Sequence, residues 1–211
     1  MIVVVDYGRG NLFSLGQALR HLGAEYKVSS DPAEVLAAKR IVLPGVGAFG
    51  DAMSGLAERG LIAALKRVAA KGTPFLGICV GCQVLLSTGE EFGRHDGLGL
   101  IAGTVARLPA PRAGDPAAIR IPNVGWRHLD VRPLAPVLSV LNGTDLVYFV
   151  HSYAPMAADP ANVAATIRVN GADIPVAVHR GSVVGVQFHP EKSGVAGLKL
   201  LRRFLETEFA R

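Results

Sequence analysis

The chain has 211 residues, of which half are hydrophobic and 18% are charged, and 22 basic against 17 acidic residues leave a formal charge of +5. This size and composition indicate one folded domain over residues 1–211 and exclude a disordered chain or a repeat array. Basic residues never run longer than two, and two cysteines do not make a disulfide framework, so we expect neither a nucleic-acid partner nor a secreted mini-protein.

The longest charge-free stretch, residues 72–89, contains glycines and a proline and fits a buried strand and helix better than a membrane span. The N-terminus lacks the basic and apolar segments of a secretory signal. We therefore expect a cytoplasmic protein that does not enter a membrane.

The first part of the chain alternates strand-like and helix-like segments. A β-branched run at 2–5 precedes leucines at helical spacing over 11–22, a strand at 40–43 precedes an amphipathic helix at 56–70, and a strand at 74–78 precedes a helix at 80–86. Such alternation predicts an α/β fold, with a doubly wound and mostly parallel sheet flanked by helices.

The second half is richer in strands. Strand-like runs occupy 103–108, 146–150, 163–169, 175–179 and 183–188, and a helical stripe over 195–209 closes the chain. A segment at 109–122 carries four prolines and is expected to be a surface loop. We expect this half to add antiparallel strands to the sheet.

The sharpest local motif is Gly77-Ile78-Cys79-Val80-Gly81, which lies between an apolar strand and an apolar helix. Flanking glycines permit an abrupt turn that exposes the central side chain at the end of the strand. The N–H groups that begin a helix favour a thiolate, the reactive form of cysteine. The motif predicts a nucleophile, and a buried structural cysteine is the alternative interpretation.

A cysteine that cleaves an amide needs a base and a group that orients the base. Among the six histidines, His189 stands two residues before Glu191, and side chains two apart in an extended segment share a face. We therefore predict Cys79 as nucleophile, His189 as base and Glu191 as the orienting carboxylate, although a His-Pro-Glu triplet alone is more often a plain strand end.

A glycine-rich turn, Gly45-Val46-Gly47, directly follows a predicted strand. Its backbone N–H groups, together with that of Val80, are candidates for an oxyanion hole, and a structural turn is the alternative. Residues 45–50 also fit a dinucleotide-binding fingerprint, but Lys66 and Arg67 stand where that motif needs an acid, and we expect no cofactor.

Cys79 and Cys82 form a C-x-x-C pair, which leaves a dithiol redox protein as a further alternative. A zinc site is set aside because no other cysteine is present, and we expect no metal. A redox function would leave the segment 187–191 and the second half of the chain without a role.

These residues together resemble the class I glutamine amidotransferases, whose glutaminase domain is doubly wound and uses a Cys-His-Glu triad. Within that class, the segments 7–11, 44–49, 74–79, 148–153 and 187–193 are similar to the glutaminase subunits of imidazole glycerol phosphate synthase, an enzyme of histidine biosynthesis. The similarity spans nearly the whole chain.

The resemblance implies that glutamine is the substrate and that it is hydrolysed to glutamate and ammonia through a thioester on Cys79. It implies that the peptide around Val46 completes the oxyanion hole. The residues that it places around the glutamine are Gly47, Gln83, Glu91, Ser152 and Tyr153.

The resemblance also implies a heterodimer with a cyclase subunit that receives the ammonia, with Asn11, Trp126, Tyr148 and Lys192 at or near the shared face. An ordinary surface or packing role is the alternative for each of these four residues. The sequence departs from the family pattern at Cys82, where methionine is usual, and at Asn123 and Arg127, where histidine and asparagine are common.

Two further alternatives remain. Another class I amidotransferase, of anthranilate or aminodeoxychorismate synthesis, would normally show histidine where Cys82 stands. A non-catalytic scaffold on the same fold would not need the intact trio of Cys79, His189 and Glu191.

Overall fold

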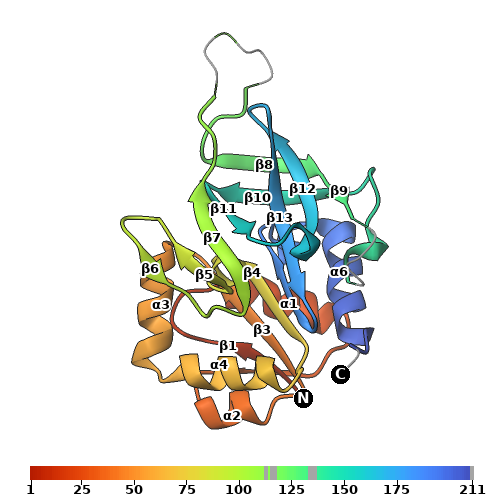
Figure 1. Cartoon of the computed structure of the whole chain (residues 1–211). Helices are drawn as coiled ribbons and strands as arrows, with labels where there is room; N and C mark the ends of the chain where they lie inside the picture. Colours follow the sequence, from red (N-terminus) through yellow and green to blue (C-terminus); the bar gives the residue numbers. More distant parts are fainter. Residues whose placement is uncertain (112–113, 115–117, 133–136, 210–211) are drawn as a thin grey trace.

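The computed structural model describes residues 1–111, 114, 118–132 and 137–209. Its central feature is a sheet of eight strands in the order β2, β1, β3, β4, β14, β13, β12, β9 (Figure 1). In chain order these strands are β1 (Ile2–Val5), β2 (Tyr26–Ser29), β3 (Arg40–Gly45), β4 (Phe75–Cys79), β9 (Asp130–Val131), β12 (Val163–Val169), β13 (Ala172–Arg180) and β14 (Val183–Val186).

The five strands from β2 to β14 run parallel to one another, and β13, β12 and β9 continue the sheet with antiparallel pairing. Strands from both parts of the chain therefore share one sheet. This is the mostly parallel, doubly wound α/β fold with added antiparallel strands that the sequence predicts.

Helices cover both faces of the sheet, as right-handed crossovers between parallel strands require. Figure 1 shows α4 in front of the strands and α1 behind them, and α2 packs against α4. The helices are α1 (Leu12–His21), α2 (Pro32–Leu36), α3 (Phe49–Glu58), α4 (Leu61–Ala70), α5 (Val80–Gln83) and α6 (Gly194–Glu206).

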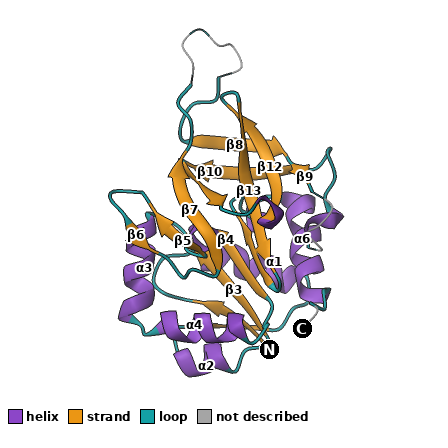
Figure 2. Cartoon of the chain, in the orientation of Figure 1, coloured by secondary structure: helices purple, strands orange, loops and turns teal. Residues whose placement is uncertain are grey.

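Two smaller sheets complete the fold. One has the order β11 (Tyr153–Ala157), β7 (Ile101–Arg107), β5 (Leu86–Gly89), β6 (His95–Asp96), and the other pairs β10 (Leu146–His151) with β8 (Asn123–His128). Figure 2 shows β8 and β10 at the end of the molecule away from α2 and α4.

The helix predicted at 56–70 is wrong in one respect, because two helices, α3 and α4, occupy that region. Gly60 separates them with a left-handed φ of +64°, a conformation that cannot continue an α-helix. Helix α3 also begins earlier than expected, at Phe49.

The helix predicted at 80–86 is also too long. It ends at Gln83, because the carbonyls of Val84 and Leu85 accept hydrogen bonds from the N–H groups of Leu98 and Leu100 rather than from a next helical turn. The chain then enters β5. Tertiary pairing overrides a local helical pattern at this point.

Other boundaries differ by a few residues. The closing helix ends at Glu206, and the strand predicted at 183–188 ends at Val186. The sequence did not predict β2, α2, β5, β6, β8, β9 or β11. Within the proline-rich loop predicted at 109–122, residues 112–113 and 115–117 lie outside the described residues.

The register of three neighbouring strands places the functional segments together. Gly45 at the end of β3 pairs with Cys79 at the end of β4, and Ile78 pairs with Val186 at the end of β14. Cys79 and the segment that contains His189 therefore meet at the carboxyl ends of adjacent parallel strands, where ligands bind in open α/β sheets.

Candidate active site

Cys79 occupies a strained turn between β4 and α5. Its φ of +56° and ψ of −114° are unusual for a residue with a side chain. A Cβ on Gly77 would lie 2.5 Å from the Gly81 carbonyl oxygen, and one on Gly81 would overlap the carbonyl oxygen of Leu43. Both positions therefore require glycine, and the turn has the elbow geometry that the motif predicts.

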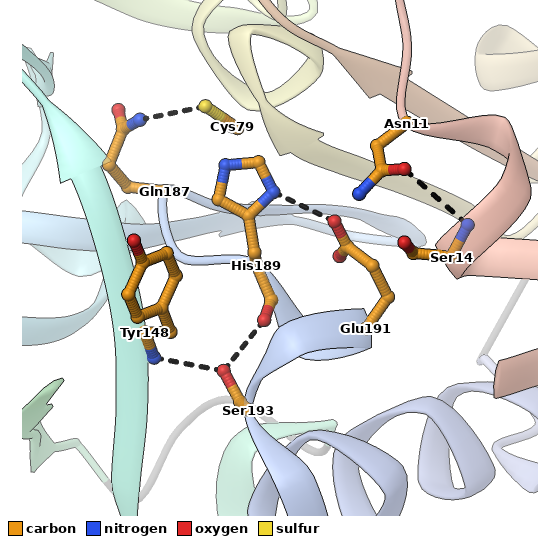
Figure 3. Close-up of polar contacts among 8 residues, drawn as sticks. All are labelled: Asn11, Ser14, Cys79, Tyr148, Gln187, His189, Glu191 and Ser193. Atoms are coloured by element: carbon orange, nitrogen blue, oxygen red, sulfur yellow. Dashed lines mark hydrogen bonds and ion pairs between the residues drawn. The ribbon is translucent and has the colours of Figure 1, made fainter. Parts of the chain in front are cut away.

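His189 and Glu191 form a buried ion pair. The Nδ1 atom of His189 lies 2.8 Å from Oε1 of Glu191, and the two side chains are 3% and 2% exposed, so water does not screen their interaction. Figure 3 shows the other ring nitrogen, Nε2, on the side that faces Cys79. Nε2 has no hydrogen-bond partner among the described residues.

The surroundings favour the protonated form of this imidazole. Burial is the largest influence and lowers the pKa of His189, but the neighbouring Cys79 sulfur and Glu191 carboxylate together outweigh it and raise the pKa to about 10. A protonated His189 beside a cysteine stabilises the thiolate.

A cavity of about 310 Å³ opens at Cys79. This volume suits a small amino acid. It is lined by nine of the residues that the sequence analysis singled out for the site, namely Val46, Gly47, Cys79, Val80, Gln83, Glu91, Ser152, Tyr153 and His189, and also by Pro122, Val150 and His151.

Gly45 and Glu191 do not line this cavity. Glu191 lies behind His189, and Gly45 lies beneath the elbow, where a Cβ would come within 2.6 Å of the Gly81 nitrogen and would overlap the Tyr7 hydroxyl. Gly45 therefore allows β3 and the elbow to approach each other closely.

Two of the lining side chains have fixed partners. Gln83 is buried and donates through Nε2 to Oε1 of Gln187 at 3.0 Å and to the Tyr153 carbonyl at 3.2 Å. Glu91 accepts through Oε2 from the N–H of Phe49 at 3.0 Å and so caps α3. Gln83 is thus a structural support of the cavity wall as well as a lining residue.

Gln187 is a site residue that the sequence analysis did not single out. Its Nε2 lies 3.7 Å from the Cys79 sulfur, as a donor toward it (Figure 3). Because Gln187 immediately follows β14, beside the end of β4, strand register rather than any local motif brings its amide to the thiol.

His151 is a second unpredicted member of the site. It ends β10, lines the cavity and is buried, and burial lowers its pKa to about 4. Nδ1 lies 2.9 Å from the Tyr153 carbonyl, and Nε2 lies 3.0 Å from Nδ2 of Asn123. Asn123 in turn accepts from Nε of Arg127 at 3.2 Å, so two of the three departures from the family pattern, Asn123 and Arg127, belong to one hydrogen-bonded group.

The four residues expected at a partner face lie outside the cavity. Trp126 and Tyr148 are cross-strand neighbours on β8 and β10 with ring centroids 5.8 Å apart in an edge-to-face arrangement, and Lys192 is exposed. Asn11 caps α1 by accepting from the N–H of Ser14. Figure 3 shows Asn11 and Tyr148 on either side of the His189 and Glu191 pair.

Tyr148 is also tied to the catalytic segment through the backbone. Its carbonyl accepts from the N–H of His189 at 2.9 Å, and its N–H donates to the Ser193 hydroxyl at 2.9 Å. The exposed β8 and β10 face is therefore continuous with the backbone that carries His189.

Cys82 is fully buried one turn after Cys79, and burial raises the pKa of its thiol well above the usual value. Both cysteines are free thiols. Among residues 1–111, 114, 118–132 and 137–209 there is no group of three histidine, cysteine or acidic side chains placed to hold a metal.

Comparisons with known proteins place this geometry in a family. The family model described as glutamine amidotransferase class-I matches residues 3–207. An imidazole glycerol phosphate synthase subunit HisH of Moorella thermoacetica is 46% identical over 206 residues, which are 97% of this chain and 94% of that protein. The HisH subunit of Desulfitobacterium hafniense is 48% identical over 204 residues, with 97% and 93% covered.

Solved structures agree on the fold. A glutamine amidotransferase crystal structure superposes with a TM-score of 0.72 at 22% identity over 98% of both chains. The structure of PurLQS from Thermotoga maritima gives a TM-score of 0.70 at 22% identity over 97% of this chain and 96% of that one.

No helix in the described part of the chain is both long enough and apolar enough to cross a membrane.

The family model matches nearly the whole chain, and two HisH subunits are 46% and 48% identical to it in sequence. Both findings are consistent with the elbow, the ion pair and the cavity described above. The chain therefore belongs to the class I glutamine amidotransferases and, within them, to the HisH subunits of imidazole glycerol phosphate synthase.

Proposed function

We propose that this chain hydrolyses glutamine at Cys79, with His189 as general base and acid and Glu191 as its orienting partner. The observation that carries the proposal is the buried pair of His189 and Glu191, which leaves Nε2 free on the side of the thiol. The trio has the arrangement of a nucleophile, a base and an orienter.

In the resting site His189 already holds the thiol proton, and the reaction begins when the Cys79 thiolate attacks the side-chain carbonyl carbon of glutamine. The tetrahedral oxyanion collapses, the carbon–nitrogen bond breaks, and His189 gives its proton to the departing ammonia. A water molecule, deprotonated by His189, then attacks the thioester to release glutamate and restore Cys79.

The oxyanion needs donors that lie close to the elbow. The N–H of Val80 begins α5 directly after the nucleophile. The exposed turn of Val46 and Gly47 lines the same cavity and follows Gly45, the strand partner of Cys79. We assign the second donor to the backbone of this turn. The loss of one such donor typically costs about 2.7–4 kcal/mol of transition-state stabilisation.

The glutamine is positioned by the remaining lining residues. Gly47, Ser152 and Tyr153 line the cavity directly, and Glu91 and Gln83 reach it while holding α3 and Gln187 in place. The cavity volume of about 310 Å³ limits the substrate to a small amino acid.

The ammonia goes to a separate cyclase subunit that makes imidazole glycerol phosphate and aminoimidazole carboxamide ribotide, in a heterodimer in the cytoplasm. The face around Trp126 and Tyr148 supports this partner, because it is exposed, aromatic and continuous with His189. The resemblance adds Asn11 and Lys192 to the residues that would contact the cyclase. Residues 1–211 act as one amidotransferase domain without a metal or cofactor.

The experiment combines this chain with a separately purified cyclase subunit and its phosphorylated ligand, and measures glutamate formed from glutamine. We expect cyclase and ligand to accelerate hydrolysis, because a site completed only in the complex prevents wasteful release of ammonia. Cys79→Ala should remove turnover and keep cyclase binding. Turnover by Cys79→Ala would refute the assignment, and rapid hydrolysis by the chain alone would refute the gating.

A further inference from the structure

One wall of the cavity is held by a group of hydrogen bonds that reaches the surface of β8. Arg127 donates to Asn123, Asn123 donates to His151, and His151 donates to the carbonyl of Tyr153. Ser152 and Tyr153, which line the cavity, follow His151 directly. These hydrogen bonds therefore run from Arg127 on β8 to the Tyr153 carbonyl in the cavity wall.

Arg127 determines which atoms of Asn123 and His151 donate and which accept. A guanidinium only donates, so the oxygen of the Asn123 carboxamide faces Arg127 and its nitrogen faces His151. The Nε2 atom of His151 must then accept. The proton of the neutral ring is consequently on Nδ1, where it donates to a carbonyl that only accepts.

The same carbonyl joins the wall to the nucleophile. Tyr153 also accepts from Nε2 of Gln83, and Gln83 donates from the same nitrogen to Gln187. The Gln187 oxygen is thereby occupied, and its nitrogen is directed at the Cys79 sulfur. The position of one backbone oxygen thus affects both the wall and the surroundings of the thiol.

His151 is suited to hold this oxygen and not to exchange protons. Both ring nitrogens are engaged, and the ring is 5% exposed. Burial lowers its pKa to about 4, with a further lowering by the charge of His189, so the ring stays neutral at neutral pH.

We propose that Asn123 and His151 are positioning residues for the glutamine pocket. They fix the Tyr153 carbonyl and with it the wall of Ser152 and Tyr153 against which the substrate binds. Arg127 sets the direction of the Asn123 amide. The proposal rests on the glutaminase function proposed above and concerns substrate binding rather than the bond-breaking step.

Two replacements of His151 separate its two hydrogen bonds. In His151→Asn the amide nitrogen takes the place of Nδ1 and keeps the donor to the Tyr153 carbonyl, whereas His151→Gln can accept from Asn123 at the place of Nε2 but loses that donor. We expect His151→Gln to raise the KM for glutamine about tenfold with a smaller change in kcat, because the Tyr153 carbonyl loses one of its two donors and keeps only Gln83. His151→Asn should recover most of this loss.

The measurement uses the complex of this chain with its cyclase subunit and cyclase ligand, and records kcat and KM for each variant. His179→Gln is the matched control. His179 is partly buried and hydrogen-bonded to a backbone group, but it lies within β13 and does not line the cavity. It should leave both constants unchanged. Equal KM values for the two His151 variants and the wild type would overturn the proposal.

A second measurement does not depend on activity. Nitrogen NMR of the full chain with labelled histidine should show His151 neutral, with its proton on Nδ1. Asn123→Leu should keep this proton on Nδ1, because the Tyr153 carbonyl still accepts it, and should shift the Nε2 resonance, because Nε2 loses its donor. A proton on Nε2 in the wild type would also overturn the proposal. If instead the wild-type complex fails to hydrolyse glutamine while the Nδ1 signal is present, the proposed function fails and the hydrogen-bond assignment stands.

Discussion

His189 and His151 line the same cavity, and only 3% and 5% of their surfaces are exposed. His189 has one nitrogen bound to a carboxylate and the other free, and its pKa is raised. His151 has both nitrogens engaged, by a backbone carbonyl and a neutral amide, and its pKa is lowered.

The comparison shows that neighbouring groups rather than burial decide what a buried imidazole does. The Glu191 carboxylate stabilises the protonated ring of His189, whereas Asn123 and the Tyr153 carbonyl leave His151 neutral with a fixed proton. One histidine can therefore carry a proton between thiol and ammonia. The other can hold a wall in place, and it does not compete for the thiol proton.

The largest expected effect is that of His189→Ala. Removal of the base should lower kcat for glutamine hydrolysis by about 10⁴-fold or more, and addition of Cys79→Ala should cost little further, because residues of one catalytic unit act together. Glutamate formation in the cyclase complex measures the loss. Cyclase binding by calorimetry is the control, and a kcat close to wild type would assign the base role elsewhere, with His151 the first candidate.

A smaller effect is expected from Glu191→Gln, which keeps the size of the side chain and removes its charge. The pKa of His189 should fall because one of the groups that raise it is gone, and kcat should drop by about 10²- to 10⁴-fold. Kinetics as a function of pH test both effects. If kcat of Glu191→Gln depends on pH as in the wild type, the Glu191 carboxylate is not what makes the pKa of His189 differ from that of His151.

A third prediction concerns stability rather than rate. The His151 pKa of about 4 in the folded chain lies below the 6.5 of an ordinary histidine, so the folded state binds fewer protons between these values. Its contribution to stability is complete above pH 6.5 and is lost as the pH falls toward about 4. The slope is at most about 1.4 kcal/mol per pH unit.

Replacement of His151 by asparagine should flatten this acid limb of the stability curve. Urea unfolding of wild type and His151→Asn at a series of pH values gives the two curves, with the exposed His128→Asn as control. Parallel curves for wild type and His151→Asn would mean that His151 is not held neutral in the fold.

The smallest effect is expected from Cys82→Ser. Cys82 is fully buried, burial raises its pKa, and it packs beside Gly185 rather than in the cavity. Glutaminase kcat should therefore stay within about twofold of wild type, apart from a loss of stability on burial of a hydroxyl. A dithiol mechanism, in contrast, would lose all activity with this change.

The sequence predicted the nucleophile, the base and the orienter because their signals are local. The elbow glycines flank Cys79 within five residues, and His189 and Glu191 are two residues apart. The alternation of strand and helix predicted a mostly parallel sheet but not its strand order. The pairing of β4 with β14, which brings the two segments together across 110 positions of chain, comes from the structure.

The hydrogen-bond partners of His151 had no such local signal. Its amide partner lies opposite it in the β8 and β10 register, as the pair Asn123 and His151, and β8 was not predicted, since Gly125 and the preceding Pro122 conceal the strand. The Gln83 carboxamide illustrates the same limit. A resemblance assigned it to the substrate, while its bonds to Gln187 and Tyr153 depend on tertiary structure.

Cys79 ends β4 and His189 follows β14, and these two strands adjoin each other inside the large sheet and are each paired on both sides. Fraying of an edge strand cannot move them apart, and their separation requires a rupture of the interior ladder. We therefore expect one unfolding step to expose the amide hydrogens of β4 and β14 to exchange and to abolish the release of ammonia. Glutaminase activity should therefore persist until the central sheet unfolds.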